Sequence, residues 1–476
     1  MAANLTEGNV WKNLIRFSIP FFLSYFLQTL YGLADLFIVG LYNGADITTA
    51  VSVGSQIMHM ITVILVGLAM GCTVLISQAV GAKMVERISY IVGNTITLFV
   101  GISVAMCVLL IALIQPIMQI MSVPPESLEQ TQAYLTICFL GIPVITVYNV
   151  LSAVFRGLGD SKTPMYFVAA ACGINILLDY ILIGVFQMQA VGAAIATIFA
   201  QTCSVIFAVI VMIRKDMGIQ LSIRHLRPKK QLMNSMLNIG FPVALQDGLI
   251  QVSFLVITVI ANMRGVEIAA AVGIVEKVIS ILFLVPSSML SAVSAISAQN
   301  IGAGLHRRAL DTLKYSIMIT VGFGFVISIF IQFISQLVVG LFTRDAVVII
   351  YGGQYLRSYV FDCMFAGIHF CFSGYFCAYE KSIFSFIHNI VSILLVRIPG
   401  AYLASVWFPN TLLPMGIAPP AGSALSALIC MGIYWKVFRK NRQFDQNECM
   451  QKNIKKILDK SGNLRYHNQR CITTAT

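Results

Sequence analysis

Charged side chains are scarce in this sequence, and acidic ones are scarcer than basic ones. Only 11% of the 476 residues are charged, with 19 Asp and Glu against 31 Lys and Arg. A soluble domain carries about 25% charged residues. Because 58% of the residues are apolar, a soluble chain would expose more apolar surface than it could bury. The composition therefore excludes an ordinary soluble protein and predicts that lipid surrounds most of the chain.

The sequence also lacks the motifs of several function classes. No cysteine pair has CxxC spacing and no cluster has zinc spacing, so we expect the eleven cysteines to be packing residues. There is no HExxH motif and no Ser–His arrangement, so we expect neither an enzyme nor a cofactor. The basic residues flank apolar runs and do not form a uniform basic surface. This distribution favours a membrane over nucleic acid as the partner.

Twelve apolar runs are long enough to cross a bilayer, which takes about 20 residues for about 30 Å. They lack the alternating pattern of barrel strands, so we expect helices. The first run is too long for the apolar part of a cleavable signal peptide, about 7–15 residues. The predicted fold class is an all-α integral membrane protein with twelve transmembrane helices in two six-helix bundles. The runs span residues 14–41, 47–80, 89–115, 128–155, 163–186, 190–213, 234–263, 268–300, 310–342, 353–380, 383–408 and 418–438.

Basic residues fall mainly on one side of this arrangement. With the N-terminus inside, the inner breaks hold Arg156, Lys229 and Arg307 among others, whereas the outer breaks near Pro124 and Pro409 have no Lys or Arg. Inner loops of membrane proteins carry an excess of Lys and Arg. We therefore predict a multi-pass protein of the cell membrane with both termini in the cytoplasm.

An internal repeat divides the chain. Gln78 and Gln299 lie 221 positions apart in similar segments, and Pro20 and Pro242 lie 222 apart. Six spans per half is an even number, so the halves are parallel repeats related by a pseudo-twofold along the membrane normal. Two facing bundles leave a cleft, which is typical of an alternating-access carrier and not of a channel. The predicted parts are the N-terminal half 1–213, a cytoplasmic basic linker 214–233, the C-terminal half 234–440 and a cytoplasmic basic tail 441–476.

Four segments resemble the multidrug and toxic compound extrusion family. They are IPFFLSYFLQTLYGLADLFIVG at 19–40, VFRGLGDSKTPM at 154–165, NILLDYILIG at 175–184 and AQNIGAG at 298–304. The resemblance covers roughly residues 10–440 and is closest to the branch with the DNA-damage-inducible bacterial members. It implies a secondary active exporter that moves H⁺ or Na⁺ inward against efflux of organic compounds. We expect these compounds to be cations, and the protein to be a monomer that contacts membrane lipids.

The first span carries a polar stripe. Gln28, Tyr31 and Asp35 are spaced i, i+3 and i+7, so they share one helix face, which we expect to point into the bundle. An Asp at a helix centre costs about 2.5–3.5 kcal/mol on insertion scales, so it is a candidate functional residue. Asp179 is the only charged residue of the fifth span, and Asn175 lies four residues before it on the same face.

By the family resemblance, Asp35, Asn175, Asp179 and Thr197 form an ion-coupling site in the first half. A carboxyl group out of water, with a second one nearby, can hold a proton at neutral pH and release it when wetted. The same oxygens suit sodium, and the sequence does not choose between the two ions or predict another metal. The alternative is that both Asp residues only hold helices together by hydrogen bonds.

Other polar residues in the spans are weaker candidates. Asn149 and Ser152 share a face of the fourth span and could complete the cavity for substrate together with Gln28 and Tyr31. Asp247 and Asp362 could lie near span ends, where charge is tolerated. We expect an unidentified carboxylate partner for Arg397.

The second half departs from the other branch of the family, because Gln251 stands near the place of an expected acid. A sodium site there is doubtful, although Glu276 or Asp247 could substitute. The three histidines of the spans, His59, His369 and His388, are expected to be packed inside.

Pro20 lies about 22 Å from Asp35 along the first helix. A proline weakens one helical hydrogen bond, so we hypothesise that Pro20 is a hinge through which ion binding at Asp35 changes the bend of this helix. A different function within the same superfamily, a flippase for lipid-linked saccharide, would favour a cleft rich in Arg and Lys. The spans hold only Lys277 and Arg397 as basic residues away from their ends, which argues against that function.

Overall fold

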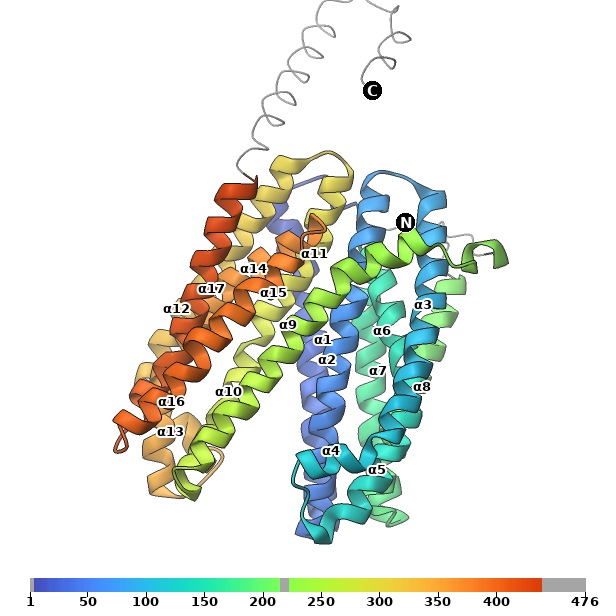
Figure 1. Cartoon of the computed structure of the whole chain (residues 1–476). Coiled ribbons are helices and arrows are strands. Elements are labelled where there is room, and N and C mark those ends of the chain that lie inside the picture. Colours follow the sequence, from blue (N-terminus) through green and yellow to red (C-terminus); the bar gives the residue numbers. More distant parts are fainter. Residues whose placement is uncertain (1–3, 215–221, 439–476) are drawn as a thin grey trace, which may run out of the picture. The chain divides into compact units, whose positions relative to one another are not determined.

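The computed structural model describes residues 4–214 and 222–438, in which all regular elements are helical (Figure 1). Residues Met1–Leu428 form one compact unit, and a second unit begins at Ile429 within the last long helix. The helices are α1 (Val10–Tyr42), α2 (Ala45–Gly81), α3 (Val85–Ala112), α4 (Ile114–Ile120), α5 (Leu128–Leu140), α6 (Ile142–Gly157), α7 (Lys162–Asp179), α8 (Gln189–Arg214), α9 (Lys230–Asn262), α10 (Val266–Leu282), α11 (Leu284–Gly302), α12 (His306–Gly340), α13 (Ala346–Tyr359), α14 (Asp362–Ala378), α15 (Ile383–Ser392), α16 (Ile398–Trp407) and α17 (Leu413–Ile433). Short turns complete these elements: η1 (Pro125–Ser127), η2 (Tyr180–Val185), η3 (Ile223–Leu226), η4 (Ile393–Arg397) and η5 (Tyr434–Phe438).

The described residues contain twelve membrane-spanning segments. Ten are helices that are long and apolar enough to cross a bilayer, and α10 with α11 counts as one of them. The other two are helix pairs bent by 48° between α5 and α6 and by 41° between α13 and α14. The predicted all-α fold with twelve spans is confirmed. The chain is a multi-pass membrane protein.

The three largest of the hydrophobic cores among the described residues show how the spans are grouped. One lies entirely within residues 38–198 and another within 257–418, so α1–α8 and the helices from α9 onward each pack around their own centre. We call these groups the N-lobe and the C-lobe. A third core combines both lobes and includes Leu75 and Ile91 from one and Met236 and Ile239 from the other.

Glycines bring the lobes into close contact along α2 and α9. A Cβ atom at Gly67 would lie 2.8 Å from Cα of Ala244, and one at Gly71 would lie 2.1 Å from the carbonyl oxygen of Met236. From the other side, a Cβ at Gly240 would lie 2.2 Å from the carbonyl oxygen of Leu68. Small residues let helix backbones approach this closely in membranes. These contacts close the lobes against each other at this level.

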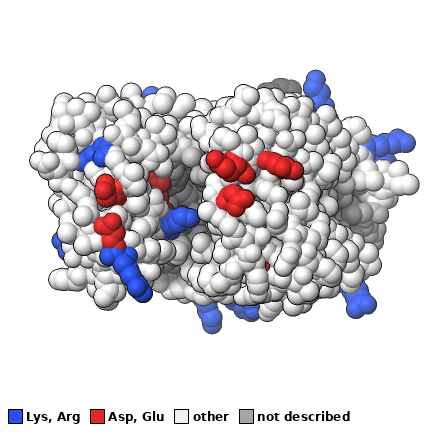
Figure 2. All heavy atoms as spheres, turned by 90° about the horizontal axis from the view of Figure 1, so that it is seen from below, with Lys and Arg blue, Asp and Glu red and all other residues white. Residues whose placement is uncertain are grey.

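The lobes separate beyond these contacts. At Gly248, the last glycine of α9, a Cβ would lie 3.8 Å from Cγ1 of Ile64, an ordinary contact without the close backbone approach seen at Gly240. The lobes diverge toward the end of the molecule away from the N-terminus (Figure 1). Seen from that end, the surface is hollowed between them (Figure 2). We call this hollow the interlobe cleft.

The described part of the linker between the lobes is bound to α3. The side chain of Asn94 donates to the carbonyl oxygen of His225 at 3.2 Å and accepts from the backbone N–H of Lys229 at 2.6 Å. The Lys229 ammonium lies 3.2 Å from the ring centre of Tyr90. Residues 215–221 of the predicted linker and the predicted basic tail 441–476 lie outside the described residues.

Candidate functional site

Two buried carboxyl groups meet inside the N-lobe. Asp35 projects from α1, and Asp179 is the last residue of α7, where the chain continues into the wider turn η2. The two side chains are 3% and 0% exposed. They lie beside each other because α1 packs along α7.

An amide and a hydroxyl group complete this cluster. Thr197 on α8 donates from Oγ1 to Oδ2 of Asp35 at 3.4 Å. Asn175 lies one turn before Asp179 on α7, is 2% exposed and also lies next to Asp35. The structure thus brings together all four residues of the predicted ion-coupling site, which we call the carboxyl cluster: Asp35, Asn175, Asp179 and Thr197.

The carboxyl cluster holds several polar atoms without hydrogen-bond partners among the described residues. They are Oδ1 of Asp35, both carboxyl oxygens of Asp179, and both polar atoms of the Asn175 amide. Buried polar atoms normally find a partner, so a concentration of unpaired ones indicates a site that binds something. Two negative charges so close and out of water repel each other strongly, and a bound cation relieves that repulsion. Carboxylate, amide and hydroxyl oxygens suit either a proton or a hard metal ion.

A pocket opens beside this cluster in the N-lobe. It encloses about 390 Å³ of space, part of it open to solvent, between α1, α2, α6 and α7. Three of the four predicted cavity residues line it: Gln28, Asn149 and Ser152. Gln28 lies two helical turns, about 10 Å, from Asp35 along α1. The pocket and the carboxyl cluster are therefore neighbours on the same helix.

The fourth predicted cavity residue lies between the pocket and the cluster. Tyr31 is not among the lining residues, and its side chain lies near Asp35, Tyr148 and Gln201. The predicted hinge Pro20 is buried within α1, one turn before Ser24, whose hydroxyl donates to the Pro20 carbonyl oxygen at 2.7 Å. Ser24 lines the pocket, so the proline lies next to its wall.

Sequence reasoning missed the pocket's basic residue. Arg156 lines the pocket from the last turn of α6, and its guanidinium lies 5.7 Å from the ring centre of Phe21. From the sequence, Arg156 counted only as an inner-loop residue that sets orientation. Its position at the end of a span that carries Asn149 and Ser152 at i−7 and i−4 was the signal that could have identified it.

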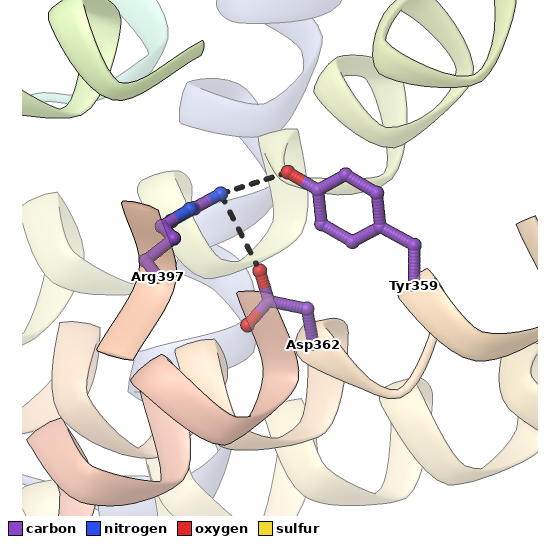
Figure 3. A network of polar contacts seen from close by, with 3 residues as sticks. All are labelled: Tyr359, Asp362 and Arg397. Atoms are coloured by element: carbon purple, nitrogen blue, oxygen red, sulfur yellow. Dashed lines mark hydrogen bonds and ion pairs between the residues drawn. The ribbon is translucent and has the colours of Figure 1, made fainter. Parts of the chain in front are cut away.

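The C-lobe contains a buried ion pair (Figure 3). Nη2 of Arg397 lies 3.7 Å from Oδ2 of Asp362 and donates to the hydroxyl of Tyr359 at 2.7 Å. The expectation of a carboxylate partner for Arg397 is confirmed. The expectation that Asp362 lies near a span end is wrong, because the bent pair α13–α14 forms one span and Asp362 lies at its bend, fully buried.

Two other acids of the C-lobe lie in mid-span positions. Glu276 on α10 accepts from Thr258 Oγ1 at 3.0 Å and lies near Arg397. Asp247 is half-buried in the middle of α9, 17 residues from its start, so the expectation of a position near a span end is wrong here too. Gln251 lies one turn further along α9.

The three span histidines differ in environment. His369 and His388 are buried, with ring centres 5.3 Å apart, and Nε2 of His388 lies 3.0 Å from Ser373 Oγ. The expected packing is confirmed for these two. It is wrong for His59, which is exposed on α2.

Comparisons with known proteins agree with this architecture. The chain is 28% identical over 416 residues to the probable multidrug resistance protein YpnP of Bacillus subtilis, covering 87% of this chain and 93% of that protein. It is 26% identical over 375 residues to the multidrug export protein MepA of Staphylococcus aureus (strain MRSA252), covering 77% and 81%. A crystal structure described as MATE in the bent conformation shares its fold, with a TM-score of 0.84, 22% identity, and coverage of 94% of this chain and 98% of that one.

A further solved structure is described as the outward-facing conformation of a multidrug resistance MATE family transporter. It has a TM-score of 0.85 to this chain at 22% identity and covers 94% of this chain and 99% of that one. The family model described as MatE matches residues 20–181 and again residues 242–403, about two thirds of the sequence. The resemblance seen in the sequence is thereby confirmed, and the chain belongs to the MatE family.

Proposed function

We propose that this protein is a multidrug exporter that couples inward movement of H⁺ or Na⁺ to the efflux of organic compounds. Export of organic compounds is supported by membership of the MatE family. It is also supported by relatives that are named multidrug resistance or multidrug export proteins. The coupling itself rests on one observation, the buried pair of Asp35 and Asp179 with its unpaired oxygens.

The carboxyl cluster supplies a reason for coupling. With no ion bound, two adjacent carboxylates repel each other and favour separation of α1 from α7. A proton or sodium ion loaded from the outer side removes this repulsion and stabilises the packed arrangement. Because the pocket shares α1 with the cluster, this packing reduces the room for substrate next to Gln28, Asn149 and Ser152. Ion and substrate thus compete for the N-lobe, as antiport requires.

The remaining parts of the proposal follow from the sequence. The protein acts in the cell membrane as a monomer surrounded by lipid, with both termini in the cytoplasm. Inward movement of one positive charge down 100 mV supplies about 2.3 kcal/mol for export. Attraction by buried carboxyl groups is the physical support for organic cations as substrates, and this preference stays a prediction.

A transport assay with imposed gradients tests the coupling. Liposomes that contain the purified protein are given a pH gradient, a sodium gradient or neither, and movement of a fluorescent organic cation is recorded. We expect movement with at least one gradient and little without. Asp35→Asn keeps the size of the side chain but cannot carry the charge, so it should abolish the gradient dependence. The matched control is Asp46→Asn, an exposed acid at the start of α2. Full gradient-driven transport by Asp35→Asn would refute the coupling role.

A further inference from the structure

One basic residue in the middle of a span is exposed without a partner. Lys277 on α10 is exposed, and no hydrogen bond or ion pair joins its ammonium group to the described residues. It lies 11 residues from the start of α10 at Val266, about 16 Å along the helix. This is about half of the 30 Å hydrocarbon thickness. A lysine at this depth needs water, because a charge in lipid is costly.

The orientation of α10 places Lys277 toward the other lobe. Helices α10 and α11 form one continuous span, and Ser291 on α11 contacts Tyr25 of the N-lobe at 2.9 Å between their hydroxyl oxygens. At about 100° per residue, Gly273 lies five full turns from Ser291 and Lys277 lies within about 40° of the same direction. Lys277 therefore faces the N-lobe from the wall of the interlobe cleft.

The composition of this helix face supports a water-filled cleft. The neighbours of Lys277 along the exposed stripe are Ala270, Gly273, Ser280 and one large apolar residue, Ile281, and a Cβ at Gly273 would meet no atom within 4 Å. A lipid-facing stripe is made almost entirely of large apolar side chains, as on α12. The exposed residues of α12 include Met318, Phe325, Val326, Ile329, Phe330, Phe333, Ile334 and Leu337.

The opposite wall, on α2, carries polar residues beside partly exposed Val53 and Met60. Gly67 faces the C-lobe through its contact with Ala244, and Thr49 lies five full turns before it. Gln56 lies within about 20° of the same direction and is exposed. No large apolar side chain of α2 is exposed, although this helix is one of the most apolar of the described spans. Both walls of the cleft thus mix polar and small side chains with a few apolar ones, and Figure 2 shows a basic side chain at its edge.

No acid near Lys277 neutralises it within the cleft. The adjacent Glu276 is turned about 100° away, toward Thr258 and Arg397 inside the C-lobe. Asp247 shares the face of α9 that packs on α2, but it lies further into the cleft. Because the hydrogen bond from Thr258 to Glu276 sets these helices at one level, Asp247 is about 15 Å further along the helix axis than Lys277. The ammonium group is therefore free to bind an anionic group from solution.

We propose that Lys277 is a substrate-binding residue of the interlobe cleft and selects organic compounds that carry a carboxylate or sulfonate group. The proposal rests on the export function above and adds acidic compounds to its substrate range. The ammonium pairs with the anionic group, while the side-chain amide of Gln56 offers a hydrogen bond from the opposite wall. A charge-assisted hydrogen bond of this kind changes affinity by about tenfold or more.

Two dyes of similar frame and opposite charge test the proposal. Carboxyfluorescein serves as the anion and rhodamine 6G as the cation, in liposomes with an imposed pH or sodium gradient. We expect the wild type to move both dyes. Lys277→Gln should raise KM for carboxyfluorescein about tenfold and leave KM for rhodamine 6G unchanged or lower. Lys277→Arg should keep KM for carboxyfluorescein close to that of the wild type. Lys162→Gln, which removes an exposed charge at the start of α7, should change KM for neither dye.

A binding measurement separates this inference from the export function. Anisotropy of carboxyfluorescein with purified protein in detergent reports binding without any gradient, and Lys277→Gln should weaken it about tenfold. Thermal unfolding of each variant establishes that it is folded. If rhodamine 6G moves but carboxyfluorescein neither moves nor binds, or if Lys277→Gln leaves KM and binding of the anion unchanged, the inference is wrong and export stands. If binding of carboxyfluorescein depends on Lys277 but neither dye is transported under any gradient, the proposed export function is wrong and the anion-binding role of Lys277 is retained.

Discussion

Gly81 and Gly302 make reciprocal contacts at the junction of the two lobes. A Cβ atom at Gly81 would lie 1.9 Å from the carbonyl oxygen of Gln299, and one at Gly302 would lie 2.0 Å from the carbonyl oxygen of Gln78. The two glycines are 221 positions apart, as are the two glutamines. Helices α2 and α11 therefore cross backbone to backbone, with each repeat presenting the same residue to the other. This crossing closes the lobes at the end opposite the interlobe cleft.

Adding a side chain at this crossing should disfavour the closed junction. We expect Gly302→Val to reduce transport by at least tenfold, because a backbone carbonyl cannot move aside without separating the helices. Hydrogen exchange should increase along the C-terminal part of α2 and along α11. The control is Gly322→Val on α12, where a Cβ would meet no atom within 4 Å. Unchanged exchange in Gly302→Val would contradict the closing role of the crossing.

The buried ion pair of the C-lobe makes a clear stability prediction. Arg397→Met leaves Asp362 charged and buried without its partner, which should cost about 3–5 kcal/mol. The double variant Arg397→Met, Asp362→Leu removes both charges and should regain much of that loss. Thermal unfolding can be followed with a thiol-reactive dye, since Cys363 and Cys371 are buried in the folded lobe. If the double variant unfolds at a lower temperature than either single variant, the two charges do not depend on each other.

Asp179 should act together with Asp35. Asp179→Asn leaves one carboxyl group in the cluster, so the repulsion between two charges disappears whether or not an ion is bound. We expect the rate of transport to become nearly independent of the gradient, as for Asp35→Asn, and the double variant to be no worse than either single one. Measured initial rates with and without a gradient test this. Additive losses in the double variant would show that the two acids act separately.

The pocket of the N-lobe can be filled to test its use by substrate. Ser152→Phe adds a ring to its lining, so KM for a bulky organic cation should rise several-fold while the gradient dependence persists. Val326→Phe adds the same ring to the exposed face of α12 and should have no effect. A normal KM in Ser152→Phe would mean that substrate does not enter this pocket.

The proline of α1 offers a test of the hinge hypothesis. Pro20→Ala restores a backbone N–H and straightens the helix. If bending at this residue transmits ion binding from Asp35 to the pocket wall at Ser24, efflux should fall and lose its dependence on the gradient. Comparison with Pro125→Ala, an exposed proline at the start of η1 that does not line the pocket, provides the control. Unchanged efflux and coupling in Pro20→Ala would refute the hinge.

The sequence predicted those features that depend on composition and helical spacing. The twelve spans follow from apolar length, and the inward position of Asp35 follows from the polar stripe of the first span, whereas its grouping with Thr197 was implied by the family resemblance. Features that depend on helix bends could not be predicted in this way. Asp362 was expected near a span end, but it lies at the 41° bend between α13 and α14, which together form one span, and it is buried beside Arg397.

Helix faces explain the other errors. His59 sits in an apolar run, so the sequence alone suggested a packed side chain. Its exposure on α2 follows from the separation of the lobes, which no local pattern encodes. The same separation gives Lys277 its surroundings. From the sequence alone, residues on the cleft walls cannot be told apart from buried span residues, because the position of the opposite lobe is not known.

The attachment of the linker to α3 restricts how the two lobes can move. The Asn94 side chain is hydrogen-bonded to the backbone of both His225 and Lys229, and α9 starts at the next residue, Lys230. We therefore expect the first turn of α9 to move with the N-lobe during any rearrangement. Together with the glycine contacts of α2 with α9 and α11, this attachment places the pivot at the closed end of the lobes, so the largest displacement is expected at the far end of α9, where the interlobe cleft opens.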